Sequence, residues 1–252
     1  TLGVGIDIAS VSPPITTKKS PMAQQTTLTP LVRGEWMPMA YEEFLDWAPD
    51  GLRSEWTDGE GIIYMTAGDR HLALILLLAS TLDGFVRRFG LGRGSLAPYP
   101  MKLWPEGPHR EPDVLFVAST HLDRWTEQRL HGPADFVLDV LSEDTAGEDQ
   151  DRKRRQYEAI GIPEYVMIDA RPGRHEFVFL RLDGDGRYQP VQPDDHGRYH
   201  SAILSGFWLR PAWFREDPSP RAETLLLEIA PDAYEAWLLA EIQARRQGQE
   251  SH

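Results

Sequence analysis

The sequence predicts a mixed α/β domain built around a central β-sheet with helices packed against it. Short apolar segments of the kind that form buried strands recur through the middle of the chain, long segments with helical apolar spacing lie among them, and turn-forming residues separate the two kinds. We place this domain at about residues 36–215. Residues 1–35 are rich in Ser, Thr and Pro without periodicity, which predicts disorder, and residues 216–252 form a helical C-terminal extension.

The first elements are a helix, a hairpin and a second helix. "AYEEFLDWA" places Tyr41, Phe44, Leu45 and Ala48 on one helical stripe. "SEWTDGEGIIYM" has the Asp-Gly pair that favours a tight hairpin turn. The apolar residues 69–89 then predict a long buried helix that ends near a glycine.

Strands follow around "APYPMKLW", "PDVLFVAS" and "DFVLDVLS". The helix "GEDQDRKRRQYEAI" stops at Gly161, with Pro163 just beyond, which is a common helix-terminating pair. Three more strands are predicted at "EYVMIDA", "HEFVFLRL" and "RYQPV". The last helix, "DAYEAWLLAEIQARR", is amphipathic, with Tyr234, Trp237, Leu238 and Ile242 on one stripe.

Composition narrows the classes of function. The 252-residue chain carries a net charge of −13, so nucleic-acid binding would require a local basic patch, because affinity for nucleic acid comes largely from neutralising phosphates. The chain has no cysteine, which excludes disulfides and thiolate metal sites and favours a cytoplasmic location. The most apolar stretch, Leu72–Leu82, is too short to span a bilayer, so we expect no membrane partner.

Two aspartates interrupt apolar strand segments. Asp139 lies in the middle of "FVLDVLS", and Asp113 begins the strand of "PDVLFVAS". Because burying a carboxylate alone is costly, each needs a partner, a metal ion or a proton. Sequential strands are often neighbours, so the two side chains are expected to converge, and a divalent cation would relieve their mutual repulsion.

A lysine on the following helix completes the cluster. Lys153, Gln156, Tyr157 and Ile160 have the spacing of one helical stripe, which should face the sheet. A lysine directed at a carboxylate cluster can orient or activate a water and stabilise charge that develops on phosphate oxygens. The residues therefore suggest metal-assisted hydrolysis of a phosphodiester.

These segments, "EPDV", "FVLDVLSEDT" and "DRKRRQYEAIGIPEYVMID", together with "AYEEFLDWA", "EWTDGEGIIYM" and "SGFWLRPAWF", resemble the Uma-type family of "putative restriction endonucleases" in the PD-(D/E)xK nuclease superfamily. The likeness covers about residues 36–215. It implies a restriction-endonuclease-like fold, with a central mixed sheet flanked by helices. It also implies a DNA endonuclease dependent on Mg²⁺ or Mn²⁺.

By this resemblance Asp113 is the aspartate of the "PD" pair, Asp139 is the second carboxylate, and Glu55 is an upstream acid that also holds the metal. Lys153 is the catalytic lysine, moved onto the helix. The superfamily pattern has lysine two residues after the second carboxylate, where this chain has Leu141, and the family commonly has Glu at the position of Asp139. His71 matches a family histidine, and Tyr157 is a second accessory candidate.

Each residue also has a structural interpretation. Asp113 could cap a strand, Asp139 could pair with a buried arginine, Lys153 could extend to solvent, and Glu55 could be a solvated strand residue. The chain could then be a catalytically inactive nuclease-fold module for binding or assembly. A homodimer is a further expectation, because cutting both strands of a duplex takes two sites.

Overall fold

The computed structural model describes residues 33–49, 51–65, 68–142, 147–169, 171, 173–174, 176–216 and 219–249. The predicted disorder of residues 1–35 falls almost entirely outside these residues. The division of the rest into a domain of residues 36–215 and a C-terminal extension stays a prediction.

The main sheet has six strands in the order β12-β11-β10-β9-β7-β4. Their bounds are β4 Gly92–Leu96, β7 Val114–Ala118, β9 Phe136–Leu141, β10 Glu164–Asp169, β11 Phe177–Leu182 and β12 Tyr188–Pro190. The pair β9–β10 is parallel and the others are antiparallel, so the sheet is mixed. A parallel pair needs a crossover, and the helix α3, Glu148–Ile160, supplies it.

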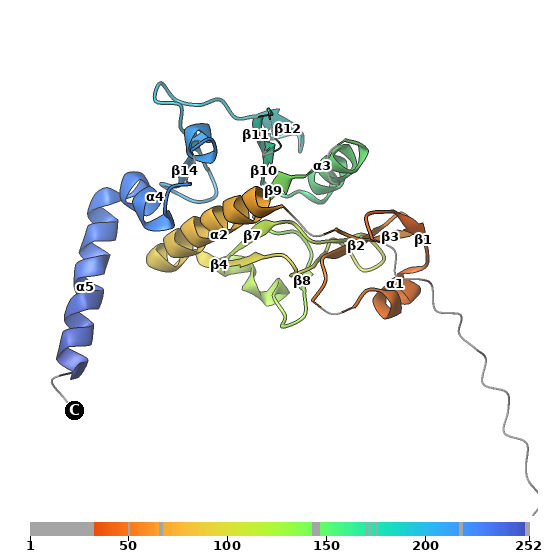
Figure 1. The fold of residues 1–252 in the computed structure, drawn as a ribbon, viewed down its shortest axis with the longest axis horizontal. Coiled ribbons are helices and arrows are strands. Elements are labelled where there is room, and N and C mark those ends of the chain that lie inside the picture. The colour runs from red at the N-terminus through yellow and green to blue at the C-terminus, as the bar shows by residue number, and fades with distance from the viewer. Residues whose placement is uncertain are drawn as a thin grey trace, which may run out of the picture. The chain divides into compact units, whose positions relative to one another are not determined.

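Both faces of the main sheet are covered, because alternate strand residues point to opposite sides. Leu138 and Val140 of β9 pack into the cluster formed with the long helix α2, Asp69–Phe89. Val137 of β9 packs on the other side, with Tyr157 of α3. Figure 1 shows α2 lying along β4 and β7. A carboxylate on the α3 side of β9 is therefore shielded from solvent by the helix and by neighbouring strands.

A second sheet was not predicted. It has the order β1-β3-β2-β6-β5-β8. Its strands are β1 Met37–Pro38, β2 Ser54–Thr57, β3 Glu60–Ile63, β5 Met101–Lys102, β6 His109–Arg110 and β8 Leu130–His131. The hairpin of β2 and β3 turns at Asp58 and Gly59, both with positive φ, as the Asp-Gly pair predicts. A further antiparallel pair joins β13, Tyr199–His200, to β14, Trp208–Leu209.

The longer predicted elements are confirmed. The helix expected at residues 69–89 is α2, and α3 ends at Ile160, where it is capped by Gly161, whose φ of 84° suits glycine. The stripe expected on the first helix, α1 Tyr41–Trp47, is partly wrong: Phe44 and Trp47 are buried, but Leu45 is 45% exposed. Of the strand expected around "APYPMKLW", two residues form β5.

Two helices follow the sheets. The predicted amphipathic helix is α5, Pro231–Gln249, which is preceded by α4, Ala222–Ile229. Tyr234 of α5 is buried in the core shared with α2, whereas Leu238 and Ile242 of its expected apolar stripe are 43% and 40% exposed. None of the helices within the described residues is long and apolar enough to cross a membrane.

Gly92, the first residue of β4, tests how tightly the edge of the main sheet is packed. Its φ is +154°, and a Cβ added there would lie 2.1 Å from the carbonyl oxygen of Val117. We expect Gly92→Ala to lower the free energy of unfolding by about 2 kcal/mol or more, measured by urea unfolding, because the new Cβ clashes and the backbone is strained. Gly184→Ala is the matched control, since nothing lies within 4 Å of its added Cβ. Equal stability of both variants would contradict the packing described.

Candidate active site

Asp113 and Asp139 face each other across β7 and β9. The register pairs Val114 with Leu138, which sets the two aspartates directly opposite. Each carboxylate accepts a hydrogen bond from a main-chain amide of the opposite strand, in place of a main-chain carbonyl. The Asp113 amide donates to Asp139 Oδ1 at 3.1 Å, and the Val140 amide donates to Asp113 Oδ2 at 2.7 Å. The regular pairing of the two strands stops at this point, so the carboxylates lie where the sheet opens.

Both aspartates are buried, and Asp113 has a cationic partner. Arg53 Nη1 lies 2.7 Å from Asp113 Oδ1. Burial nevertheless raises the pKa of Asp113 to about 6, because it outweighs the effect of Arg53 and because the charge of Asp139 adds to it. Asp139 accepts a hydrogen bond from the neutral Tyr165 hydroxyl at 2.8 Å.

His71, at the start of α2, lies beside the same carboxylate. Its Nε2 is 3.9 Å from Asp113 Oδ1. Burial, followed by the charge of Arg53, lowers the pKa of His71 to about 4, so the ring is neutral at neutral pH. The predicted accessory histidine is therefore next to the aspartates but adds no charge to them.

Glu55 is completely buried and lies among cations. Its Oε1 is 2.8 Å from Lys153 Nζ, and its Oε2 is 2.7 Å from Arg110 Nη1. Burial would raise the pKa of Glu55, but Lys153 and Arg110 outweigh it and lower this pKa to about 2. The Glu111 amide and the Tyr64 hydroxyl also donate to the Glu55 carboxylate, at 3.2 Å and 3.0 Å.

Lys153 is directed into the site. It is 2% exposed, and its helix α3 also contributes Asp149, which pairs with Arg110 at 3.1 Å. Burial lowers the pKa of Lys153, but the carboxylates of Asp139, Glu55 and Asp149 outweigh it, and the pKa is raised above its ordinary value. Lys153 is thus an ammonium group at neutral pH, suited to donating hydrogen bonds and stabilising anionic oxygens.

A small cavity reaches the aspartates. It has a volume of about 10 Å³, room for about one water-sized species, and it is lined by Arg53, Asp113, Asp139, Val140, Leu141, Gln150, Lys153 and Tyr165. Mg²⁺ commonly takes one or two carboxylates and keeps several waters, so the two aspartates match its ligand type and number, but the cavity would have to open to admit the ion with its waters. Within the described residues no three His, Asp or Glu side chains form a metal-binding group. Glu55 is held by cations, and its role as a metal ligand stays a prediction.

The predicted residues therefore gather in one place, although their chemical roles stay predictions. Lys153 does not extend to solvent, and Glu55 is not a solvated strand residue. Tyr157 is buried in the α3-side core. The sequence interpretation missed Arg53 and Arg110, which supply much of the compensating positive charge. The signal for them was weak: each lies one or two residues from an acid in a segment that carries a site residue.

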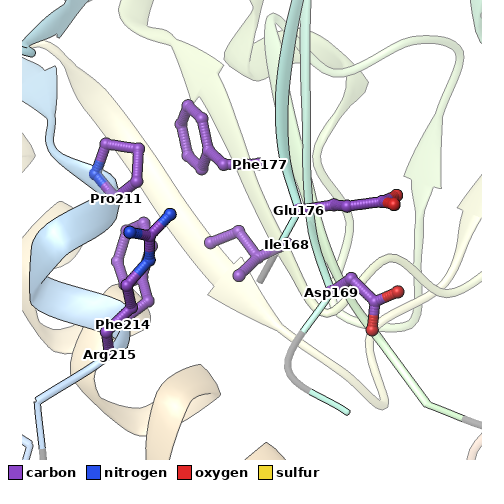
Figure 2. A pocket seen from close by; sticks show the side chains of 7 residues that line it. All are labelled: Ile168, Asp169, Glu176, Phe177, Pro211, Phe214 and Arg215. Atoms are coloured by element: carbon purple, nitrogen blue, oxygen red, sulfur yellow. The ribbon is translucent and has the colours of Figure 1, made fainter. Parts of the chain in front are cut away.

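Another pocket, at the end of β10, is less suited to catalysis. Its lining residues are Ile168, Asp169, Glu176, Phe177, Pro211, Phe214 and Arg215. Figure 2 shows the carboxylates of Asp169 and Glu176 pointing away from the aromatic side of this pocket. Asp169 is held by two hydrogen bonds from the Arg171 guanidinium, at 2.9 and 2.6 Å, and Phe177 stacks on Phe214. This arrangement is typical of packing rather than of a reaction centre.

Comparisons with known proteins point to the same family as the sequence motifs. A family model described as "Putative restriction endonuclease", Uma2, matches residues 41–212, more than half of the chain. Among solved structures the chain is similar to one described as a "putative nuclease belonging to DUF820" from Anabaena variabilis ATCC 29413. That similarity has a TM-score of 0.57 and 15% identity over 70% of this chain and 97% of the other. The predicted fold class is confirmed. No curated protein matches the chain.

Two tyrosines that pack edge to face, Tyr157 and Tyr165, provide a matched pair of substitutions. The Tyr157 hydroxyl is buried without a hydrogen-bond partner among the described residues, so Tyr157→Phe should leave stability unchanged or raise it by up to about 1 kcal/mol. Tyr165→Phe removes a donor from buried Asp139 and should cost about 1.5–3 kcal/mol. Thermal unfolding of both variants measures the difference. A larger loss at Tyr157 would show that its hydroxyl has a role.

The raised pKa of Asp113 predicts a pH-dependent stability in metal-free buffer with chelator. Between the unfolded pKa of about 3.9 and the folded value of about 6, the folded chain holds a proton that the unfolded chain has released. This contribution to the free energy of unfolding is full below about pH 4 and is lost by about pH 6, a fall on the order of 3 kcal/mol. In Asp113→Asn the fall should be absent. Parallel pH profiles for the two proteins would rule out the assignment.

Proposed function

The chain belongs to the Uma2 family, and on that premise we propose that it is a Mg²⁺-dependent nuclease that hydrolyses DNA phosphodiester bonds at the Asp113–Asp139 site. One observation carries the proposal: two buried aspartates oppose each other where two strands part, with the ammonium group of Lys153 directed toward them. Such a combination is suited to a cation and a phosphate.

Asp113 and Asp139 would hold the metal ion. Their carboxylates line one small cavity, and their mutual repulsion raises the energy of the state in which both are ionised without a cation. When bound, Mg²⁺ would supply Lewis-acid activation of the phosphate and of a water. Mn²⁺ prefers similar oxygen ligands and is the alternative ion.

Lys153 would act as a hydrogen-bond donor and a fixed positive charge. Because its pKa is raised, it is a poor general base, and it would orient the attacking water or stabilise a phosphate oxygen. Glu55 would be a positioning residue, because its ion pair at 2.8 Å holds the Lys153 ammonium in place. Arg53 would have to share Asp113 with the ion or move toward the phosphate.

A second candidate function rests on Arg53. Its guanidinium lies 2.7 Å from Asp113 and neutralises that carboxylate without any metal ion, as in a structural ion pair. In that case the chain would be an inactive nuclease-fold module for binding or assembly. Calorimetric titration separates the two functions: heat at millimolar Mg²⁺ that is lost in Asp139→Asn supports the nuclease, and its absence in wild type supports the module.

We expect end-labelled DNA to be cut in Mg²⁺ and to stay intact with chelator. Lys153→Met and Asp139→Asn should lower the cleavage rate on the order of 100-fold or more, because each removes a group that stabilises the transition state. Arg155→Ala is the matched control, since Arg155 lies on the same helix with an exposed side chain. Circular dichroism verifies that each variant is folded. A folded Lys153→Met protein that cuts at the wild-type rate would refute the assigned role.

A further inference from the structure

A row of side chains leads from the aspartates across the main sheet. In the parallel pair β9–β10, Asp139 is in register with Met167, and in the next pair Met167 is in register with Val178 of β11. Residues in register on neighbouring strands share a face, and strands are about 4.8 Å apart. Met167 and Val178 are therefore the first and second neighbours of the catalytic carboxylate, on the side covered by α3.

A cavity of about 340 Å³ lies over this row. It is lined by Gln150, Asp151 and Arg154 of α3 and by Met167, Val178, Leu180 and Pro190 of the sheet, and we call it the α3–β11 pocket. Met167 and Leu180, each 4% exposed, form an apolar floor. Asp151 and Arg154 are exposed and belong to its rim.

Gln150 connects the pocket with the aspartates. It lines the α3–β11 pocket and also the small cavity that contains Asp113 and Asp139. Its side-chain amide donates to Met167 Sδ at 3.0 Å, which holds it at the boundary between the two. A ligand in the pocket would therefore lie next to any group bound at the carboxylates.

The pocket has the chemistry of a nucleobase site. Its volume is within the range of about 300–1,000 Å³ found for small-molecule sites. An apolar floor suits a flat ring, the amide of Gln150 and the carboxylate of Asp151 suit the polar edge of a base, and the Arg154 guanidinium suits a neighbouring phosphate. An aliphatic ligand would make no use of these three polar groups.

We propose that the α3–β11 pocket binds the base of the nucleotide adjacent to the scissile phosphate, so that the substrate is an unstacked strand. This proposal rests on the proposed nuclease function and specifies its substrate class. A base in a duplex is stacked and paired, and it has to leave the helix before it can enter such a pocket. The chain should therefore prefer single-stranded or locally melted nucleic acid to an intact duplex of the same length.

Binding is measured without metal, so that no cleavage occurs. Fluorescence anisotropy with chelator compares a labelled single-stranded DNA, the same DNA as a duplex, and a strand of the same length made of abasic residues. We expect the single strand to bind about 10-fold or more tightly than the duplex or the abasic strand, as base stacking on a protein surface contributes. Equal binding of the normal and abasic strands would overturn the proposal, because phosphates alone would then account for affinity.

Variants locate the effect in the pocket. Val178→Phe fills the cavity, and Arg154→Ala removes the cation at its rim. Each should weaken single-strand binding about 10-fold. Val178→Phe should weaken binding of the abasic strand less than binding of the normal strand. Arg155→Ala, one residue along the helix, should bind within about twofold of wild type, as expected of an exposed residue outside the pocket. Arg154→Ala alters an exposed side chain, so it stays informative if Val178→Phe fails to fold. Unchanged binding by folded Arg154→Ala would overturn the proposal.

Cleavage in Mg²⁺ separates this proposal from the nuclease function. If Lys153→Met abolishes cleavage but single strands and duplexes are cut equally, the pocket proposal fails and the nuclease function stands. If single-strand binding depends on Val178 and Arg154 but no DNA is cut, the nuclease function fails and the pocket remains as a binding site for bases.

Discussion

The structure depends on positively charged side chains that balance the charge of carboxylates buried inside it. The Glu55 side chain is completely buried, and burying its negative charge would cost too much free energy without two cations. These are Arg110 and Lys153, whose nitrogens lie 2.7 and 2.8 Å from the Glu55 carboxylate oxygens. Asp113 depends in the same way on Arg53. In both of these cases the acid and its cations come from segments distant in sequence, so these charges can be balanced only when the whole fold is assembled.

This balance explains the second sheet. Its strands β2 and β6 are short, yet they bring Glu55 and Arg110 together and set them against Lys153 of α3. Arg53, just before β2, reaches across to the main sheet. The small sheet therefore positions one half of the charged cluster, and the main sheet with α3 positions the other. Stability and the arrangement of the site arise from the same contacts, so loss of activity in a variant is informative only beside a measurement of its folding.

The sequence predicted those helices and strands that are determined by local patterns of apolar residues. The periodic apolar spacing of residues 69–89 predicted α2, and the apolar run around Asp139 predicted β9. The opposed aspartates followed from the tendency of sequential strands to be neighbours. Two-residue strands such as β5 and β6 have no periodicity to detect, because they are defined by pairing with distant segments. Arg110 was missed for a related reason: a buried arginine looks like a surface residue until its partners on β2 and α3 are known.

The exchange of hydrogen bonds between Asp113 and the strand of Asp139 has a consequence for comparing related sequences. Because these carboxylates replace main-chain acceptors, they end the regular hydrogen bonding between β7 and β9, independently of any catalysis. A relative that had lost its enzymatic activity would still need acceptors there to keep its strands apart in the same way. Retention of both acids is thus weak evidence of turnover, and retention of Lys153 is no stronger, because its ammonium group also balances the buried charge of Glu55.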